Sequence, residues 1–191
     1  GPSTFCSYLY EILKDHFKVI IYNYKLLYPS FLFPGTTQFD KSNVTVKKAP
    51  SLRIINSINP FNWFTTARKL LKENADLIVF DWWHPFFAPC HFTISLLIKG
   101  KYKNKILFIT ENFISHEANF IDNFLTKIGL KNADHFLALS DVVAKDLESI
   151  SKGRNVYRSV LPNFDCYTDA GNFDRNTERE KLGYDKDNLV L

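Results

Sequence analysis

Continuous apolar runs alternate with amphipathic segments along most of the chain. The apolar runs are rich in β-branched and aromatic residues, which predicts strands in a sheet covered on both faces. The predicted strands are FKVIIYNYK (17–25), VTVKKAP (44–50), SLRIINS (51–57), DLIVFDWW (76–83), KNKILFIT (103–110), HFLALS (135–140), NVYRSVLPN (155–163) and NLVL (188–191).

Segments whose apolar residues recur every three or four positions predict helices. The first holds Phe5, Leu9, Ile12 and Leu13, with Ser3 or Thr4 as its cap. The others are NPFNWFTTARKLLKENA (59–75, capped by Asn59 and with Pro60 at its first position), PFFAPCHFTISLLIKG (85–100, closed by Gly100), NFIDNFLTKIGLKNA (119–133), SDVVAKDLESISKG (140–153, capped by Ser140 and followed by Gly153) and FDRNTEREKLGYD (173–185).

Strands and helices alternate regularly from Phe17 to Asn163. This alternation predicts an α/β fold, a Rossmann-like, doubly wound and mostly parallel sheet with helices on both faces. The segment 162–173 loses periodicity and collects Pro, Asp, Asn and Gly, which indicates a linker. We therefore expect an N-terminal Rossmann-like domain over residues 1–163, and a linker with the start of a second domain over 164–191.

The first residues match a turn that leads directly into a helix. A doubly wound domain begins with a strand, then a Gly-bearing turn, then such a helix. We therefore expect the first strand to be missing, although Gly1-Pro2 is also a sequence that tag removal leaves behind. A sheet that lacks this strand exposes unpaired edges, so we expect poor solubility or oligomers.

Composition narrows the class of protein only slightly. A hydrophobic content of 46% and a charged content of 23% are ordinary for a globular protein, and 191 residues can bury a large core. The aromatic content of 16% suits either that core or a site for a flat or ring-shaped ligand. A net charge of +4 is too small to indicate nucleic-acid binding.

The densest basic run, KGKYKNK (99–105), has two interpretations: a solvated turn, or attraction to anionic lipid headgroups. The 3 Cys are far apart and form no CxxC motif, which favours a reduced, cytoplasmic compartment. Peripheral contact with the inner membrane face is the alternative. No signal peptide and no apolar run of about 18 residues is visible, so no segment is expected to span a membrane.

Polar side chains follow most of the predicted strands, and ligands of open α/β sheets bind outside the carboxyl ends of the strands. Their convergence on one edge predicts a binding site there. The candidates are Gly1, Pro2 and Ser3 after the missing strand, Trp82, Trp83 and His84 after the fourth predicted strand, Glu111, Asn112, His116 and Glu117 after the next, then Ser140, Pro162, Asn163 and Asp165.

Each candidate also has a purely structural interpretation. One of the two tryptophans is expected to pack a helix on the sheet, because alternate strand residues face opposite sides. His84 can cap the helix that follows it, and Asn112 can shape a turn. Ser140 can cap its helix or hold an anion on the free N–H groups there. His116 and Glu117 can form a surface pair before a helix.

Several common types of site are excluded because their motifs are missing. The sequence has no Walker-type GxxxxGK[ST], no GxSxG, no HExxH and no complete GxGxxG. It also shows no Cys or His spacing typical of metal ligands. We therefore expect neither a metal nor an organic cofactor.

The order of these elements and the residues at the strand ends together suggest a family. The stretches concerned are 1–25, 28–40, 58–89 (INPFNWFTTARKLLKENADLIVFDWWHPFFAP), 106–119 (ILFITENFISHEAN), 133–149 (ADHFLALSDVVAKDLES), 160–167 and 179–191. Taken in order, they cover nearly the whole chain and resemble the N-terminal half of a GT-B glycosyltransferase of the family-4 type. No single motif among them is decisive.

The resemblance implies two Rossmann-like domains that face each other across a cleft. The N-terminal domain would shape the acceptor site, and a C-terminal domain absent from this chain would hold the nucleotide-sugar. The implied reaction is the retaining transfer of a hexose to a glycan or lipid-linked acceptor, in the synthesis of a cell-surface polysaccharide or glycolipid. This chain alone would be inactive.

The resemblance also assigns roles to residues. His84 and Glu111 are expected to be catalytic, and Glu111 stands where the family often has a His, so it would act as an acceptor or base. Gly1, Pro2 and Ser3 match a loop that approaches the donor phosphates, although Pro2 removes one N–H group. Acceptor-binding roles fall to Trp82, Trp83, Asn112, His116 and Glu117, with the indoles as the floor of a groove.

Two other functions stay open on the sequence. One is a non-catalytic Rossmann-like module that binds a nucleotide or a partner. The other is a different enzyme of GT-B type, such as one that epimerises a sugar. A gene that continues past Leu191 into a domain with a Gly-rich turn and a paired-acid motif would favour the glycosyltransferase.

Overall fold

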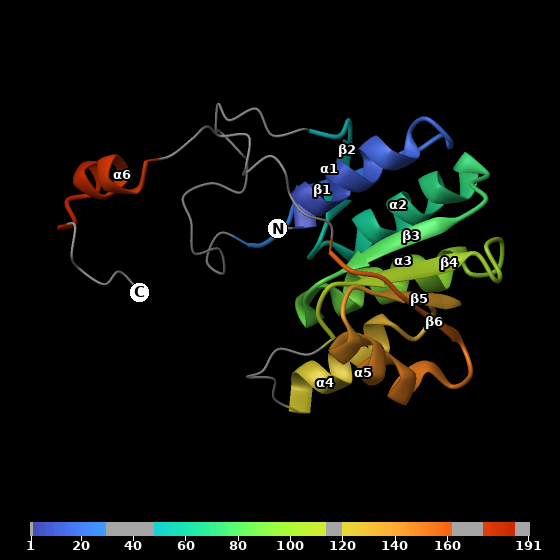
Figure 1. Cartoon of the computed structure of the whole chain (residues 1–191). Coiled ribbons are helices and arrows are strands. Elements are labelled where there is room, and N and C mark those ends of the chain that lie inside the picture. Colours follow the sequence, from blue (N-terminus) through green and yellow to red (C-terminus); the bar gives the residue numbers. More distant parts are fainter. Residues whose placement is uncertain (1, 30–47, 114–119, 162–173, 186–191) are drawn as a thin grey trace.

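The computed structural model describes residues 2–29, 48–113, 120–161 and 174–185, and helices alternate with strands through most of them (Figure 1). The strands are β1 (Tyr22–Leu26), β2 (Leu52–Asn56), β3 (Ile78–Trp82), β4 (Ile106–Thr110), β5 (His135–Ala138) and β6 (Asn155–Arg158). The helices are α1 (Pro2–Leu13), α2 (Pro60–Glu73), α3 (Ala88–Ile98), α4 (Phe120–Gly129), α5 (Asp141–Ser151) and α6 (Arg175–Lys181). A short 3-10 helix, η2 (Pro85–Phe87), precedes α3.

Two parallel sheets form the centre of the fold. The larger has the order β3-β4-β5-β6, and Figure 1 shows its strands side by side in sequence order. Its register pairs Ile78 with Ile106 and Trp82 with Thr110, so the strands end at one common edge. In the smaller sheet, β1 pairs with β2. This arrangement confirms the predicted Rossmann-like α/β fold with parallel strands.

Helices cover both faces of the larger sheet. On one face, Phe5 of α1 joins Ile109 and Leu139 in a small buried cluster. On the other face, aromatic strand residues form a larger core, in which the rings of Phe80 and Phe108 stack at 4.8 Å. Helices α2, α3 and α5 contribute buried side chains to that core, as a doubly wound sheet requires.

Several predicted helix ends are confirmed. The Asn59 side chain accepts a hydrogen bond from the Asn62 amide at 3.3 Å, with Pro60 at the first position of α2. Ser140 Oγ accepts from the Val143 amide at 3.2 Å at the start of α5. Each cap satisfies an amide that a helix start otherwise leaves unpaired.

Other predicted ends are wrong. Because α1 already begins at Pro2, Ser3 and Thr4 lie inside its first turn and do not cap it. Gly100 follows α3 without a left-handed backbone, whereas Asn74 and Lys152 end α2 and α5 with φ of 50° and 51°.

Some predictions fall on residues that the structure does not describe. Most of the predicted strand 44–50 lies outside the described residues, and its last three residues, 48–50, are not in a strand. The predicted linker 162–173 and the predicted strand 188–191 also lie outside them. In the C-terminal part that is described, α6 contains no buried residue.

Candidate functional site

The carboxyl edge of the larger sheet brings several of the predicted site residues together. Trp82 ends β3, and Trp83 and His84 follow it. The Glu111 amide donates to the Trp82 carbonyl at 3.0 Å, so the ladder between β3 and β4 extends one residue beyond β4. Asn112 is exposed directly after it. This edge is where the sequence places the site.

Trp82 lies in the core. Its side chain is 0% exposed, its ring contacts His91 with 5.8 Å between centroids, and it fills the space that a side chain at Gly129 would need. A fully buried indole cannot form the floor of an open groove. The groove role expected of Trp82 therefore does not fit its position, and its structural interpretation does.

Trp83 lies in a cluster of aromatic rings at the same edge. Its ring is 4.5 Å from Phe87 of η2 and 6.0 Å from Tyr24 of β1, measured between centroids. Tyr28 and Phe86 extend the cluster, with 5.2 Å between their rings. Because Trp83 and Phe86 are only partly buried, this aromatic cluster offers apolar surface to a ligand.

His84 is exposed and has one ring nitrogen already in use. Its Nδ1 accepts a hydrogen bond from the Phe86 amide at 3.1 Å and so caps η2. A neutral imidazole that accepts at Nδ1 carries its proton on Nε2. His84 can therefore present an N–H donor to a ligand while it holds the cap.

An acidic cluster lies beneath the start of α1, and Glu111 is the one member of it that was expected at the site from the sequence. We call Cys6, Asp81 and Glu111 the carboxyl cluster. Cys6 Sγ donates to Asp81 Oδ2 at 3.6 Å, and the alternation of side chains along the strands puts both acids on the face that α1 covers. Asp81 Oδ1 and Glu111 Oε1 are buried and have no hydrogen-bond partner among the described residues.

Burial controls the charge of this cluster. It raises the pKa of Asp81 to about 7, and the nearby Glu111 adds to the rise while the Cys6 hydrogen bond opposes it. Burial also raises the pKa of Glu111. The pKa of the Cys6 thiol is raised by burial and then by the charge of Asp81, so the thiol stays protonated. Near neutral pH, Asp81 can therefore either give up or take up a proton.

The signal for Asp81 is present in the sequence but weak. An acid at the fifth position of the apolar run LIVFD is out of place in a buried strand, and its period-2 partners share its face. The site was expected after the strand, so this residue within the strand was overlooked. Nothing in the sequence links Cys6 to this acid, because they are 75 positions apart.

The remaining predicted residues are not all placed. Gly1, His116 and Glu117 lie outside the described residues, so the donor-phosphate loop is seen only from Pro2, the first residue of α1, onward. Ser3 is exposed within the first turn of that helix.

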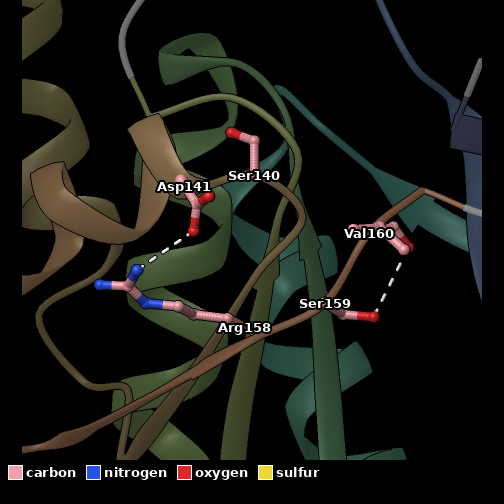
Figure 2. A pocket seen from close by; sticks show the side chains of 5 residues that line it. All are labelled: Ser140, Asp141, Arg158, Ser159 and Val160. Carbon is pink, nitrogen blue, oxygen red and sulfur yellow. Dashed lines mark hydrogen bonds and ion pairs between the residues drawn. The ribbon is translucent and has the colours of Figure 1, made fainter.

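A shallow pocket of about 170 Å³ lies farther along the same edge, between α5 and the end of β6. Figure 2 shows the Arg158 and Asp141 side chains pointing toward each other across one side of it, and these groups are 3.1 Å apart. Arg158 also pairs with Glu148 at 2.7 Å. The pocket lining is Ser140, Asp141, Arg158, Ser159 and Val160. Ser140 caps α5 as predicted. The first turn of α5, which borders the pocket, carries the negative charge of Asp141.

Two lysines of the basic run 99–105 make contacts with the protein itself. Lys99 Nζ lies 3.0 Å from the Asn132 carbonyl and 3.7 Å from the Asp134 carboxylate. Lys101 donates to the Leu71 carbonyl and to the Asn74 side chain. These contacts tie the turn to the ends of α2 and α4, which agrees with the interpretation as a turn.

Comparisons with known proteins leave the family undecided, since no family model, no curated protein and no solved structure matches the chain. Over the described ranges, none of the helices combines the length and the apolar character needed to cross a bilayer. In the same part of the chain, no three His, Cys, Asp or Glu side chains are grouped closely enough to hold a metal ion.

Proposed function

We propose that the chain is the acceptor-side half of a retaining, nucleotide-sugar-dependent glycosyltransferase. The observation that carries the proposal is the carboxyl cluster at the carboxyl edge of a Rossmann-like sheet. Its two acids come from the ends of neighbouring strands, and each has one buried oxygen without a hydrogen-bond partner among the described residues. Burial raises the pKa of Glu111, which makes this carboxylate a better base for a hydroxyl proton. The aromatic cluster around Trp83 lies at the same edge and can stack on a sugar face.

In the proposed reaction, the acceptor hydroxyl oxygen forms a bond to the anomeric carbon as the bond from that carbon to the nucleoside diphosphate breaks. The carboxylate of Glu111, the member of the carboxyl cluster that follows the end of β4, takes the hydroxyl proton, and the diphosphate leaves with the bonding electrons. The Nε2–H group of His84 donates a hydrogen bond to the acceptor or the leaving group. Charge on the diphosphate is stabilised by groups of the opposing domain.

The test uses the full-length protein and a panel of nucleotide-sugars. A nucleotide-sugar that binds should raise the melting temperature, because a ligand of the folded state stabilises it by mass action. With that donor, His84→Ala and Glu111→Gln should each lower turnover by about a hundredfold or more while the melting temperature without ligand stays near that of the unmodified protein.

The matched control is His16→Ala, because His16 is exposed and follows the last turn of α1, whereas the carboxyl cluster lies near the first turn. This variant should keep normal turnover. If both site variants retain normal turnover, or if no sugar is transferred from any donor, the proposed function is rejected.

One observation favours a second candidate, a non-catalytic module that binds a nucleotide or a partner. Two residues expected at the site already have structural roles, since Trp82 fills the core and His84 caps η2. The same panel separates the candidates, because a binding module is stabilised by its nucleotide but releases no nucleoside diphosphate.

A further inference from the structure

Strands β1 and β3 each have one edge without a partner in the described part of the chain. There, β1 is hydrogen-bonded to β2 alone, and β3 is hydrogen-bonded to β4 alone. The carboxyl ends of β1 and β3 lie together, because Tyr28, just after β1, contacts Phe86, just after β3, with 5.2 Å between their rings. Open strand edges of this kind offer rows of unpaired N–H and C=O groups.

The same helices cover both strands. On one face, His91 of α3 lies 2.8 Å from the Tyr24 hydroxyl of β1, and its ring contacts Phe80 of β3 with 5.5 Å between centroids. On the other face, α1 reaches β3 through Cys6 and Asp81. Ser7, the next residue of α1, accepts from the amide of residue 49, just before β2, at 3.3 Å. The space between β1 and β3 is therefore inside the layer of strands.

Side chains beside this space remain open to solvent despite the helices above and below. Val79 of β3 is 45% exposed, and Phe80 and Tyr24 are only partly buried. One strand farther into the sheet, Phe108 is 0% exposed. Asp81 Oδ1, which has no hydrogen-bond partner in the described part of the chain, belongs to the same open strand. Side chains of β1 and β3 beside this space are thus less buried than those of β4, farther into the sheet.

We propose that this space receives one parallel β-strand, and that the strand is polypeptide leading directly into α1. We call the space the strand slot. Filling it gives the order β2-β1-new strand-β3-β4-β5-β6. With the new strand numbered first, this is the order 3-2-1-4-5-6 of doubly wound dinucleotide-binding sheets, with one further strand at the end. The new strand should be about as long as its neighbours β1 and β3, which have 5 residues each. It should also be apolar, because helices cover both faces of the sheet at this position.

The direction in which α1 runs indicates that the segment before α1 fills the strand slot. Early in α1, Phe5 packs with Ile109 and Leu139 near the carboxyl ends of β4 and β5. One turn later, Leu9 joins the same cluster together with residues 107 and 137, which lie farther back along those strands. The helix therefore starts at the carboxyl edge and runs back along the sheet. A parallel strand in the slot ends at that edge, so a short turn joins it to α1 with the usual right-handed crossover to β1.

The experiment compares hydrogen–deuterium exchange of the 191-residue chain with that of two fusions. In the first, a designed strand of about six Val and Ile residues precedes Gly1. In the control, prolines replace alternate residues of the same segment, because proline cannot donate to a sheet ladder. We expect amides of β1 and β3 to exchange at least about tenfold more slowly in the first fusion than in the other two proteins. Amides of β6, at the outer edge of the sheet, should not change.

Three results would overturn the proposal. The first is that the amides of β1 and β3 exchange at the same rate in all three proteins. This includes the case in which all three proteins are unfolded. The second is slowing that extends equally to β6, which indicates general stabilisation. The third is protection of β1 and β3 in the unfused chain that grows with protein concentration, which assigns the strand slot to a second copy. None of these readouts depends on sugar transfer, so they stand apart from the proposed function.

Discussion

Asp81 is the single residue whose chemistry has the clearest consequence for the folded state. Its pKa rises from 3.8 to about 7 on folding, chiefly because burial disfavours the charge. The folded state then holds the proton more tightly than the unfolded state does, so the free energy of unfolding falls as pH rises from about 4 to about 7. Asp81→Asn removes this titration. We expect a flatter pH profile and a gain on the order of 1–3 kcal/mol at pH 8, measured by urea denaturation.

A matched control for this titration is available on the surface. Asp15 is exposed just after α1, so Asp15→Asn should keep the pH profile of the unmodified chain. Part of the slope should survive in Asp81→Asn, because the pKa of Glu111 is also raised. An Asp81→Asn profile that matches the unmodified chain over the whole window would mean that Asp81 is not protonated by burial.

At the scale of elements, the position of α4 depends on the absence of one side chain. A Cβ atom at Gly129, the last residue of α4, would overlap the six-membered ring of Trp82 and lie 3.1 Å from the Ala88 Cα atom. Because both neighbours are fully buried, neither can move aside cheaply. We expect Gly129→Ala to lower the free energy of unfolding by about 1–3 kcal/mol in chemical denaturation, although alanine favours helices.

Two further variants test the contact itself. Gly100→Ala is the control, because nothing lies within 4 Å of a Cβ atom at Gly100, and its stability should hardly change. In a double-mutant cycle, Trp82→Phe should relieve part of the penalty of Gly129→Ala, since the smaller ring frees space. Additive effects of the two changes would show that Gly129 and Trp82 do not press on each other.

Elements were predictable from the sequence wherever local chemistry decides them. Asn59 and Ser140 were identified as caps because short polar side chains before apolar periodicity satisfy helix amides. The end of α3 was not predictable in this way. A glycine after a helix usually adopts a left-handed backbone, but Gly100 does not. Asn74 and Lys152, which are not glycines, adopt that backbone at the ends of α2 and α5. Contacts between distant positions, such as Cys6 with Asp81, have no local signal at all.

For the whole molecule, the alternation of strands and helices was enough to predict parallel pairing and a common carboxyl edge. The alternation did not show which face of the sheet the side chain of each residue at that edge lies on. Of the neighbours Trp82 and Trp83, one is fully buried and the other partly open, and only packing against α3 and α4 decides which. The edge of the sheet was therefore predictable, whereas the carboxyl cluster within it required coordinates.

The division into two sheets predicts that the molecule opens in two steps. Strand β4 is largely buried and every second residue of β5 is buried, whereas no residue of β1 or β2 is buried. Local opening is easiest where few apolar contacts are lost, so β1 and β2 should open at a lower free energy than the larger sheet. Native-state hydrogen exchange at low denaturant should show their amides exchanging first, by about tenfold or more, while β4 and β5 exchange only with global unfolding. Equal opening free energies in all strands would mean that the two sheets unfold as one cooperative unit, and that contacts such as Tyr24 with His91 couple them across the strand slot.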